Sequence, residues 1–213
     1  AVDGTLRALK AAKSSGVKRV ILTSSMAAIY GRELESGISE YDETMWTDVT
    51  HPVGRGAYTK SKTLAERAAW GYIKSDAPEI ALTTINPVLV LGAPLDKNFG
   101  ASISLVERIL MGKDPMLPDL KFAIVDVRDV AKIHVQALEN TSANGKRFIV
   151  STERAYSFQE MAQVLKSNGY DQVSTKVAPN LLLKFMANFN SDLKGLLPYI
   201  GNTFNGDVNE TMK

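Results

Sequence analysis

The chain has 213 residues, of which 45% are hydrophobic and 23% are charged, a size and composition typical of one large globular domain or of one domain with a small appendage. Its 25 basic and 23 acidic residues are scattered, which disfavours nucleic-acid binding, and no apolar run approaches the roughly 18 residues that indicate a membrane span. The lack of cysteine excludes disulfides and thiolate chemistry and favours a cytoplasmic location, and the wide separation of His51 and His134 disfavours a zinc site, so we expect no bound metal.

Helical and strand patterns alternate in the first half of the chain. Residues 3–14 have the apolar spacing of a helix that ends at Ser14-Ser15-Gly16. The run Val20-Ile21-Leu22 is typical of a buried parallel strand. A polar stretch at 31–56 predicts a loop, after which helical spacing returns at 58–75.

The second half continues this alternation. The segment "IALTTINPVLVLGAP" predicts a second buried strand, and residues 102–112 a short helix. The segment "KFAIVDVRDVAKIHVQALEN" predicts a strand followed by a helix capped by Asp126 or Asp129, and "KRFIVS" predicts a third core strand. Ser157 and Glu160 fit a capping box at the start of another helix. Strands that alternate with helices indicate an α/β fold with a parallel sheet.

Tyr58 and Lys62 stand four residues apart on the helix predicted at 58–75. This spacing places them on one helix face, with about 5 to 6 Å between their Cβ atoms. The pKa of a free tyrosine is about 10, but a nearby ammonium favours the phenolate and lowers the pKa, which makes such a tyrosine a usable acid or base. The same spacing occurs by chance on many helices, so the neighbouring motifs must decide.

Two predicted strands end in residues that suit this chemistry. The first ends in Thr23-Ser24-Ser25, and the carboxyl ends of parallel strands are where open α/β sheets bind ligands. A serine hydroxyl there can hold a carbonyl oxygen while charge develops on it, although each hydroxyl is equally suited to capping a turn. In "NPVLVLGAP", Pro87 lacks an N–H, so we expect the strand to bend there and its backbone to meet a ligand.

The order of these motifs resembles that of a known family. Thr-Ser-Ser after a strand, Tyr-x-x-x-Lys on the next helix, Asn-Pro-x-x-Val-x-Gly after the following strand and then "DVRDVA" resemble the extended short-chain dehydrogenases/reductases, in particular the branch of dihydroflavonol, cinnamoyl-CoA and methylglyoxal reductases. The resemblance covers nearly the whole chain. It implies the C-terminal part of a Rossmann-like, doubly wound parallel sheet, formed by residues 1–92 and 122–150, with a small α/β substrate-binding subdomain formed by residues 93–121 and 151–213.

The resemblance also implies roles for single residues. Ser25 would hold the substrate carbonyl, Tyr58 would give or take the proton, and Lys62 would bind the nicotinamide ribose and lower the tyrosine pKa. His134 would have a packing or surface role. Besides Tyr58 and Lys62, contacts with the cofactor, NADP(H) rather than NAD(H), would come from Thr23, Ser24, Pro87, Val88, Val90 and Ser102.

The implied activity is NAD(P)H-dependent reduction of a small-molecule ketone or aldehyde to an alcohol. Substrate contacts would come from residues 30–56 and 92–120 and from the region after about 153. Two alternatives stay open. Relatives with the same three residues act on nucleotide sugars or 3β-hydroxysteroids, and the chain is also compatible with a truncated or binding protein without catalysis.

Members of this family begin with a strand and a Gly-x-x-Gly-x-x-Gly turn that holds the cofactor's pyrophosphate, and the present sequence contains no such motif. By resemblance, about four strands would precede Ala1, so we expect an excerpt of a longer protein that binds cofactor poorly by itself. The strand Val20-Ile21-Leu22 would then have an open apolar edge, through which we expect self-association.

Overall fold

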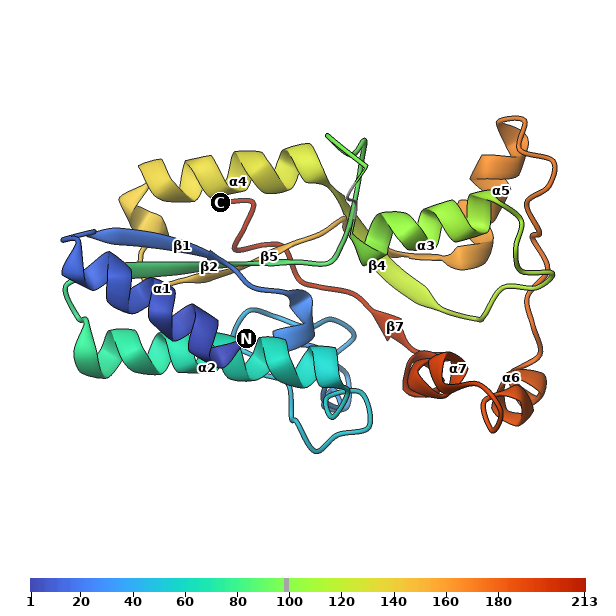
Figure 1. Cartoon of the computed structure of the whole chain (residues 1–213), viewed down its shortest axis with the longest axis horizontal. Helices are drawn as coiled ribbons and strands as arrows, with labels where there is room; N and C mark the ends of the chain where they lie inside the picture. Colours follow the sequence, from blue (N-terminus) through green and yellow to red (C-terminus); the bar gives the residue numbers. More distant parts are fainter. Residues whose placement is uncertain (98–99) are drawn as a thin grey trace.

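The computed structural model describes residues 1–97 and 100–213, which form a larger and a smaller part, each built on its own sheet (Figure 1). The larger part contains the parallel strands β1 (Arg19–Thr23), β2 (Ala81–Pro87) and β5 (Arg147–Val150), in the order β1-β2-β5. Helices α1 (Val2–Ser14) and α2 (Ala57–Asp76) cover one face of this sheet, and α4 (Val127–Glu139) covers the other. The predicted α/β fold, with a parallel sheet between helices, is confirmed.

Strand β2 is buried by helices on both faces. Its Leu82 packs with Leu9 of α1 and Ala69 of α2, whereas its Ile85 packs with Val130 of α4. Successive side chains of a strand point to opposite faces, so a strand covered on both sides needs few solvent-facing polar residues. This burial explains why the strand could be predicted from its sequence.

The apolar stretch that we predicted as one strand forms two. Strand β2 ends at Pro87, and the chain continues as β3 (Leu89–Leu91), which pairs with β4 (Lys121–Asp126) in the second sheet. Pro87 has no N–H with which to extend the first ladder, and the next N–H, that of Val88, donates to the Val150 carbonyl at 3.3 Å. The expected bend at Pro87 is therefore confirmed, and it carries the chain from one sheet to the other.

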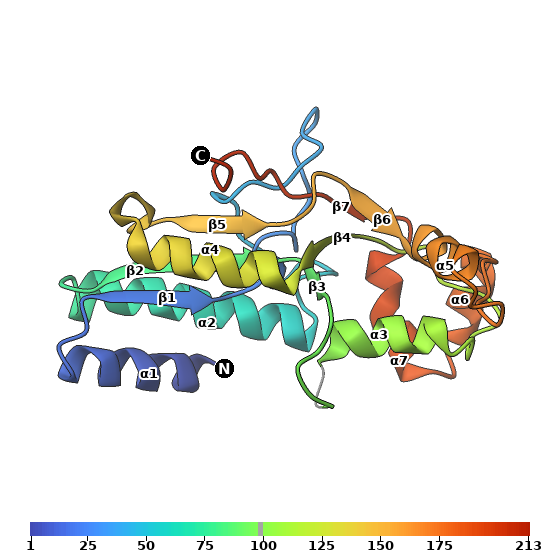
Figure 2. The ribbon, with the colours of Figure 1, turned by 90° about the horizontal axis from the view of Figure 1, so that it is seen from above.

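The smaller part surrounds β4. Strand β4 pairs in parallel with β3 and with β7 (Thr203–Phe204), and antiparallel with β6 (Ala155–Ser157). Around this sheet lie α3 (Ala101–Leu110), α5 (Phe158–Ser167), α6 (Asn180–Met186) and α7 (Ser191–Leu196), as Figure 2 shows from above. The 3₁₀ segments within the described residues are η1 (Met26–Ala28), η2 (Thr141–Ala143) and η3 (Leu197–Tyr199). Elements α6, α7 and β7 occupy a region whose sequence showed no regular pattern.

The two parts share packing through β4. Its first residues pair with β6 and β7, whereas its Val125 belongs to the cluster around Ile85 in the larger part. The domain limits expected from the sequence therefore stay a prediction, and within them residues 98–99 lie outside the described structure. The helix caps are clearer. Asp126 caps α4 by accepting from the Arg128 N–H, and the capping box of α5 is confirmed.

Strand β1 lies at the edge of the larger sheet. In the ranges that the structure describes, β2 is its only ladder partner, and Figure 2 shows the order β5, β2, β1 with α1 beyond it. The Arg19 guanidinium donates to the carbonyls of Ala137, at 3.0 Å, and Asn140, at 2.7 Å, at the C-terminal end of α4. A cation is favourable there because the carbonyls at a helix C-terminus carry partial negative charge. This contact ties the start of β1 to α4.

Candidate active site

The carboxyl end of β1 leads directly into the predicted serines. Ser24 and Ser25 follow Thr23, and the Ser25 hydroxyl caps η1 by accepting from the Ala27 N–H at 3.1 Å. The Ser24 N–H donates to the Ile85 carbonyl at 2.8 Å, which keeps the backbone extended beyond the strand. Neighbouring side chains on an extended backbone point to opposite sides, so the two hydroxyls face different environments.

The predicted tyrosine, lysine and second serine lie together. Tyr58 occupies the first turn of α2, and its hydroxyl donates to the Ser25 Oγ over 3.4 Å, a long hydrogen bond. The Lys62 Nζ lies 5.8 Å from the centre of the Tyr58 ring, and no carboxylate in the described part of the chain forms a salt bridge with it. Tyr58 as a whole is 60% exposed.

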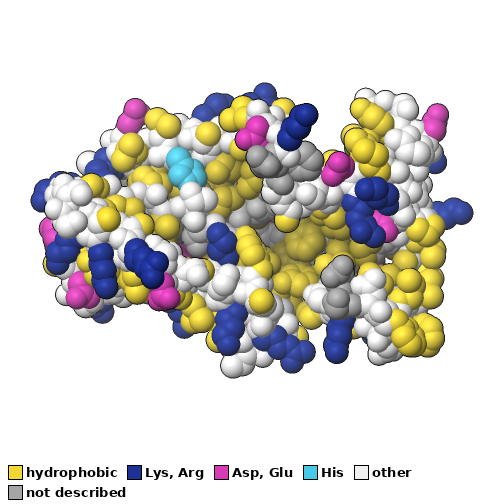
Figure 3. Space-filling view, in the orientation of Figure 1, with side chains coloured by type: hydrophobic (Ala, Val, Ile, Leu, Met, Phe, Trp, Pro, Cys, Tyr) yellow, Lys and Arg dark blue, Asp and Glu magenta, His cyan; other side chains and the backbone are white. Residues whose placement is uncertain are grey.

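Ser25 and Tyr58 border a cavity of about 620 Å³, which Pro87, Val88 and Ser102 also line. The described residues around it include no Asp, Glu, Lys, Arg or His. Figure 3 shows apolar side chains gathered in the hollow between the larger and the smaller part. The cavity therefore combines the hydroxyls of Ser25 and Tyr58 with a mainly apolar lining.

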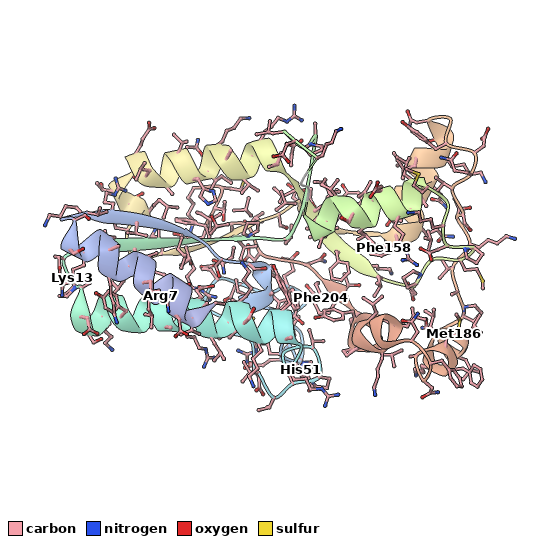
Figure 4. All side chains as sticks on the ribbon, in the orientation of Figure 1. Arg7, Lys13, His51, Phe158, Met186 and Phe204 are labelled. Carbon is pink, nitrogen blue, oxygen red and sulfur yellow. The ribbon has the colours of Figure 1, made fainter. Side chains whose placement is uncertain are left out.

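Aromatic rings form one wall of this cavity. The Phe204 ring lies 4.8 Å from that of Tyr30 and 5.8 Å from those of Phe122 and Tyr199, between ring centres, and the Phe122 ring lies 6.1 Å from that of Phe158. Phe158 and Phe204 lie toward the middle of the molecule in Figure 4. These residues come from five separate segments, and four of the five belong to the smaller part or its strands. Ring pairs at such distances are favourable beyond the area they bury.

Two tyrosine hydroxyls are held in the same wall. The Tyr199 Oη and the Thr59 Oγ1 lie 3.2 Å apart, which connects η3 to the residue after Tyr58. Burial, reinforced by the neighbouring Tyr199, raises the pKa of Tyr30 well above its usual value. Tyr30 therefore keeps its proton and can serve as a hydrogen-bond donor in the wall.

Thr23 is engaged by the helix on the other face of the sheet. The His134 Nδ1 lies 2.8 Å from the Val130 carbonyl, which can only accept, so Nδ1 carries a hydrogen. The other ring nitrogen, Nε2, lies 2.8 Å from the Thr23 hydroxyl and forms a hydrogen bond with it, in which the hydroxyl donates when the imidazole is neutral. His134 thus links α4 to the end of β1, and the cofactor contact expected of Thr23 stays a prediction.

Two predicted cofactor contacts have their side chains elsewhere. Ser24 is buried and donates its hydroxyl to the carboxylate of Glu66, and Val90 packs against the cluster that contains Ile85 and Val130. Neither side chain lines the cavity beside Tyr58. The contacts with a cofactor expected of Ser24 and Val90 therefore stay predictions.

Glu66 and Arg147 form a buried ion pair, and Glu66 contacts Ser24. The Arg147 Nε donates to the Glu66 Oε1 at 2.6 Å, and their side chains are 9% and 0% exposed. The Asn86 amide donates to the Glu66 Oε2 at 2.8 Å and to the Ser25 carbonyl at 3.1 Å. Sequence reasoning missed Glu66. The sequence feature that could have indicated Glu66 is its spacing, because Tyr58, Lys62 and Glu66 follow one another at intervals of four residues along one helix face.

Arg147 also fixes the loop that precedes α2. Its Nη1 donates to the carbonyls of Glu43, at 2.5 Å, and Met45, at 2.6 Å, and its guanidinium stacks 3.9 Å from the centre of the Trp46 ring. The Nη2 atom of Arg147 is buried without a hydrogen-bond partner among the described residues. The ion pair thus connects β5, α2 and the loop before α2.

The residues at this site fit one end of a nicotinamide cofactor. Ser25 and Tyr58 offer hydroxyls, Lys62 offers a cation, and Pro87 and Val88 offer an apolar surface for a ring. The chain contains no Gly-x-x-Gly-x-x-Gly segment for the pyrophosphate. The structure describes no group of three or more His, Asp or Glu suited to a metal, and no helix in residues 1–97 and 100–213 has the length and apolar character to cross a membrane.

Comparisons with known proteins identify relatives of the chain. Residues 1–151 match the family model described as the NAD dependent epimerase/dehydratase family. A cinnamoyl-CoA reductase of Medicago truncatula is 37% identical over 169 residues, which are 78% of this chain and 50% of that protein. An NADPH-dependent methylglyoxal reductase of Saccharomyces cerevisiae is 33% identical over 182 residues, which are 78% of this chain and 52% of that protein. The chain thus spans about half the length of these relatives.

Solved structures of reductases also superimpose on this chain. The yeast methylglyoxal/isovaleraldehyde reductase complexed with NADPH superimposes with a TM-score of 0.71 at 29% identity, over 82% of this chain and 56% of that chain. Vestitone reductase from alfalfa superimposes with a TM-score of 0.72 at 26% identity, over 99% of this chain and 63% of that chain.

Proposed function

The chain belongs to the NAD-dependent epimerase/dehydratase family, the extended short-chain dehydrogenases/reductases, and we propose that it contributes the active site of an NAD(P)H-dependent reductase that converts a ketone or aldehyde to an alcohol. One observation carries the proposal. The Tyr58 hydroxyl contacts the Ser25 hydroxyl and lies beside the Lys62 ammonium, at the mouth of an apolar cavity at the carboxyl ends of β1 and β2.

Each of the three side chains has a distinct task in this proposal. The Ser25 hydroxyl donates to the substrate carbonyl oxygen, which orients the substrate and stabilises the charge that develops on this oxygen. Tyr58 transfers its proton to the same oxygen, and the Lys62 ammonium stabilises the phenolate that is left. When bound, the cofactor would supply the hydride, with its nicotinamide ribose near Lys62 and its ring against Pro87 and Val88.

The cofactor that we propose is NADP(H) rather than NAD(H). The yeast relative is named as NADPH-dependent, and its structure was solved with NADPH. We expect the isolated chain to bind this cofactor weakly because its residues fit only the nicotinamide end. Titration followed by NADPH fluorescence measures this affinity. Tight binding would contradict the expectation, and binding too weak to detect would favour a binding or truncated protein without catalysis.

The cavity favours an uncharged substrate with an apolar substituent. A charged group that enters a site lined by rings and aliphatic side chains loses its hydration and gains no counter-charge among the described lining residues. A nucleotide sugar would bring a diphosphate to a lining without Lys or Arg. We therefore propose that the substrate is a neutral ketone or aldehyde whose ring or chain packs on Phe122, Tyr199 and Phe204.

The proposal is tested by the turnover of the chain at high NADPH concentration with a panel of neutral aldehydes and ketones, a diketone, a nucleotide sugar and a 3β-hydroxysteroid. We expect activity with the neutral carbonyl compounds, lost in Tyr58→Phe and Ser25→Ala. A matched control is Tyr170→Phe, which removes a hydroxyl from another exposed tyrosine, on the segment after α5. Equal turnover in Tyr58→Phe and wild type, or no turnover with any neutral carbonyl compound, would refute the proposal.

A further inference from the structure

Glu66 is a buried carboxylate to which the proposed chemistry assigns no task. It is 1% exposed, and four side chains direct donors at its two oxygens. The donors are Ser24 Oγ, Asn86 Nδ2, Arg147 Nε and Trp70 Nε1 at 3.3 Å, whereas the Thr84 hydroxyl, 3.3 Å from Oε1, lies closer to the Asn86 Oδ1, at 3.0 Å. This arrangement of donors, one of them an arginine, suits a group whose two oxygens both accept.

The contacts of Glu66 lead directly to the serine of the active site. Its Oε2 atom accepts from both Ser24 and Asn86, and the Asn86 amide also donates to the Ser25 carbonyl. The side chain of residue 24 and the carbonyl of residue 25 are therefore both held by one network. Because these two points restrict the backbone on both sides of the Ser25 Cα, they also restrict the direction of its Cα–Cβ bond, and the Ala27 N–H then holds the hydroxyl at 3.1 Å.

The same helix carries the partner of that hydroxyl. Tyr58 and Glu66 both lie on α2, two turns apart, and the helix keeps their separation fixed. Glu66 acts on the position of Ser25 through Asn86, and Tyr58 contacts Ser25 at the start of the helix. Helix α2 therefore carries both the residue that positions Ser25 and the tyrosine that contacts it.

Stability alone does not explain a charged pair in this place. Well-packed apolar residues of similar volume often stabilise a protein as well as a buried ion pair does, because burying two charges has a high desolvation cost. A directional network, by contrast, adds constraints on the orientation of the backbone at Ser24 and Ser25.

We propose that Glu66 is a positioning residue, which holds the Ser25 hydroxyl against the Tyr58 hydroxyl through Asn86 and Ser24. Its carboxylate offers two acceptor atoms, one used by Arg147 and the other by Ser24 and Asn86. In Glu66→Gln the side chain keeps its shape but has one oxygen. If that oxygen serves Arg147, the amide NH₂ faces the donors of Ser24 and Asn86, and the link to Ser25 is lost.

The test uses the 213-residue chain labelled with ¹³C at the Cζ of tyrosine, because this NMR signal responds to the hydrogen bonding of the phenol. The Tyr58 signal is identified by its absence in Tyr58→Phe, and Ser25→Ala measures the shift caused by loss of the contact. The matched control is Thr83→Val, which removes a buried hydrogen bond, from the Thr83 hydroxyl to the Ala143 carbonyl at 2.7 Å, on the opposite face of β2.

We expect Glu66→Gln to move the Tyr58 signal in the direction seen in Ser25→Ala, and by at least half as much, while Thr83→Val leaves it in place although both variants melt at lower temperature. An unmoved signal in Glu66→Gln, or an equal shift in Thr83→Val, overturns the inference. If Glu66→Gln fails to fold, Ser24→Ala replaces it with the same expected direction. The inference takes its importance from the proposed function, but its test needs neither cofactor nor turnover, so the two can fail separately.

Discussion

Replacement of Arg147 by methionine should be among the most destabilising single changes in the chain. The substitution keeps much of the volume but removes the bond from Nε to the Glu66 Oε1, the bonds to the Glu43 and Met45 carbonyls and the stacking on Trp46. Glu66, whose side chain is 0% exposed, would be left without its buried counter-ion.

The size of the effect follows from these contacts. Removing one partner of a buried ion pair costs about 3 to 5 kcal/mol. The Nη2 atom of Arg147 is buried without a partner in the described structure, so its loss recovers part of that cost, and we expect about 3 kcal/mol. In a chain of this length, each kcal/mol lowers the melting temperature by roughly 2 to 4 °C, which gives a decrease of roughly 6 to 12 °C.

Differential scanning calorimetry of three variants tests this reasoning. The matched control is Arg128→Met, which breaks an ion pair with Asp126 at the protein surface and should leave the melting temperature unchanged within error. The double variant Glu66→Leu with Arg147→Met removes both charges and should melt above Arg147→Met alone. If Arg147→Met melts like Arg128→Met, or if the double variant is the least stable of the three, the carboxylate does not depend on Arg147.

Three other features lead to measurable outcomes. The pKa of Glu160 is lowered to about 2, first by the Ser157 N–H and then by Arg154, so its stabilising effect is complete above about pH 4.5 and disappears as the pH falls toward about 2. The difference in melting temperature between wild type and Glu160→Gln should shrink over that window, and a constant difference would contradict the assignment. The raised pKa of Tyr30 gives stability that is present below about pH 10 and lost as the pH rises further. Above about pH 10, Tyr30→Phe should therefore lose less stability than the wild type does. Identical alkaline profiles of melting temperature for the two proteins would contradict this. We also propose that the chain self-associates through the open edge of β1, with a mass in light scattering that grows with concentration, and a stable monomer would exclude this.

The sequence predicted the elements whose signals are local. The apolar runs of β1 and β2, the caps at Asp126 and Ser157 and the bend at Pro87 depend on a few neighbouring residues, and the structure has each of them. The resemblance to the family also implied that Ser25 and Tyr58 act on the same carbonyl oxygen, and their hydroxyls lie 3.4 Å apart.

The features that could not be predicted depend on distant partners. Glu66 is a charged residue on a helix, which normally indicates a solvent-exposed face, but its partners Ser24 and Arg147 lie 42 and 81 residues away. Strand β7 has two residues, too few for a periodic pattern, and it pairs with β4, which is distant from it in the sequence. The aromatic wall was missed for the same reason, since its rings come from five segments.

The contact between Tyr199 and Thr59, 140 residues apart in the chain, lies between the groups proposed for proton transfer and the aromatic rings of the cavity. Evolution can change these two sets of residues separately. The groups proposed for proton transfer belong to α2 and to the segment that follows β1, whereas the aromatic rings that face them belong mostly to the smaller part. The contact between Tyr199 and Thr59 is one point that fixes the position of these two sets relative to each other. Substitutions at Phe122, Phe158 or Phe204 can therefore alter which molecules fit while the proton donor keeps its geometry. A lineage could diversify its substrates in this way through the smaller part alone, and a change at Tyr199 would be the exception because it would affect both.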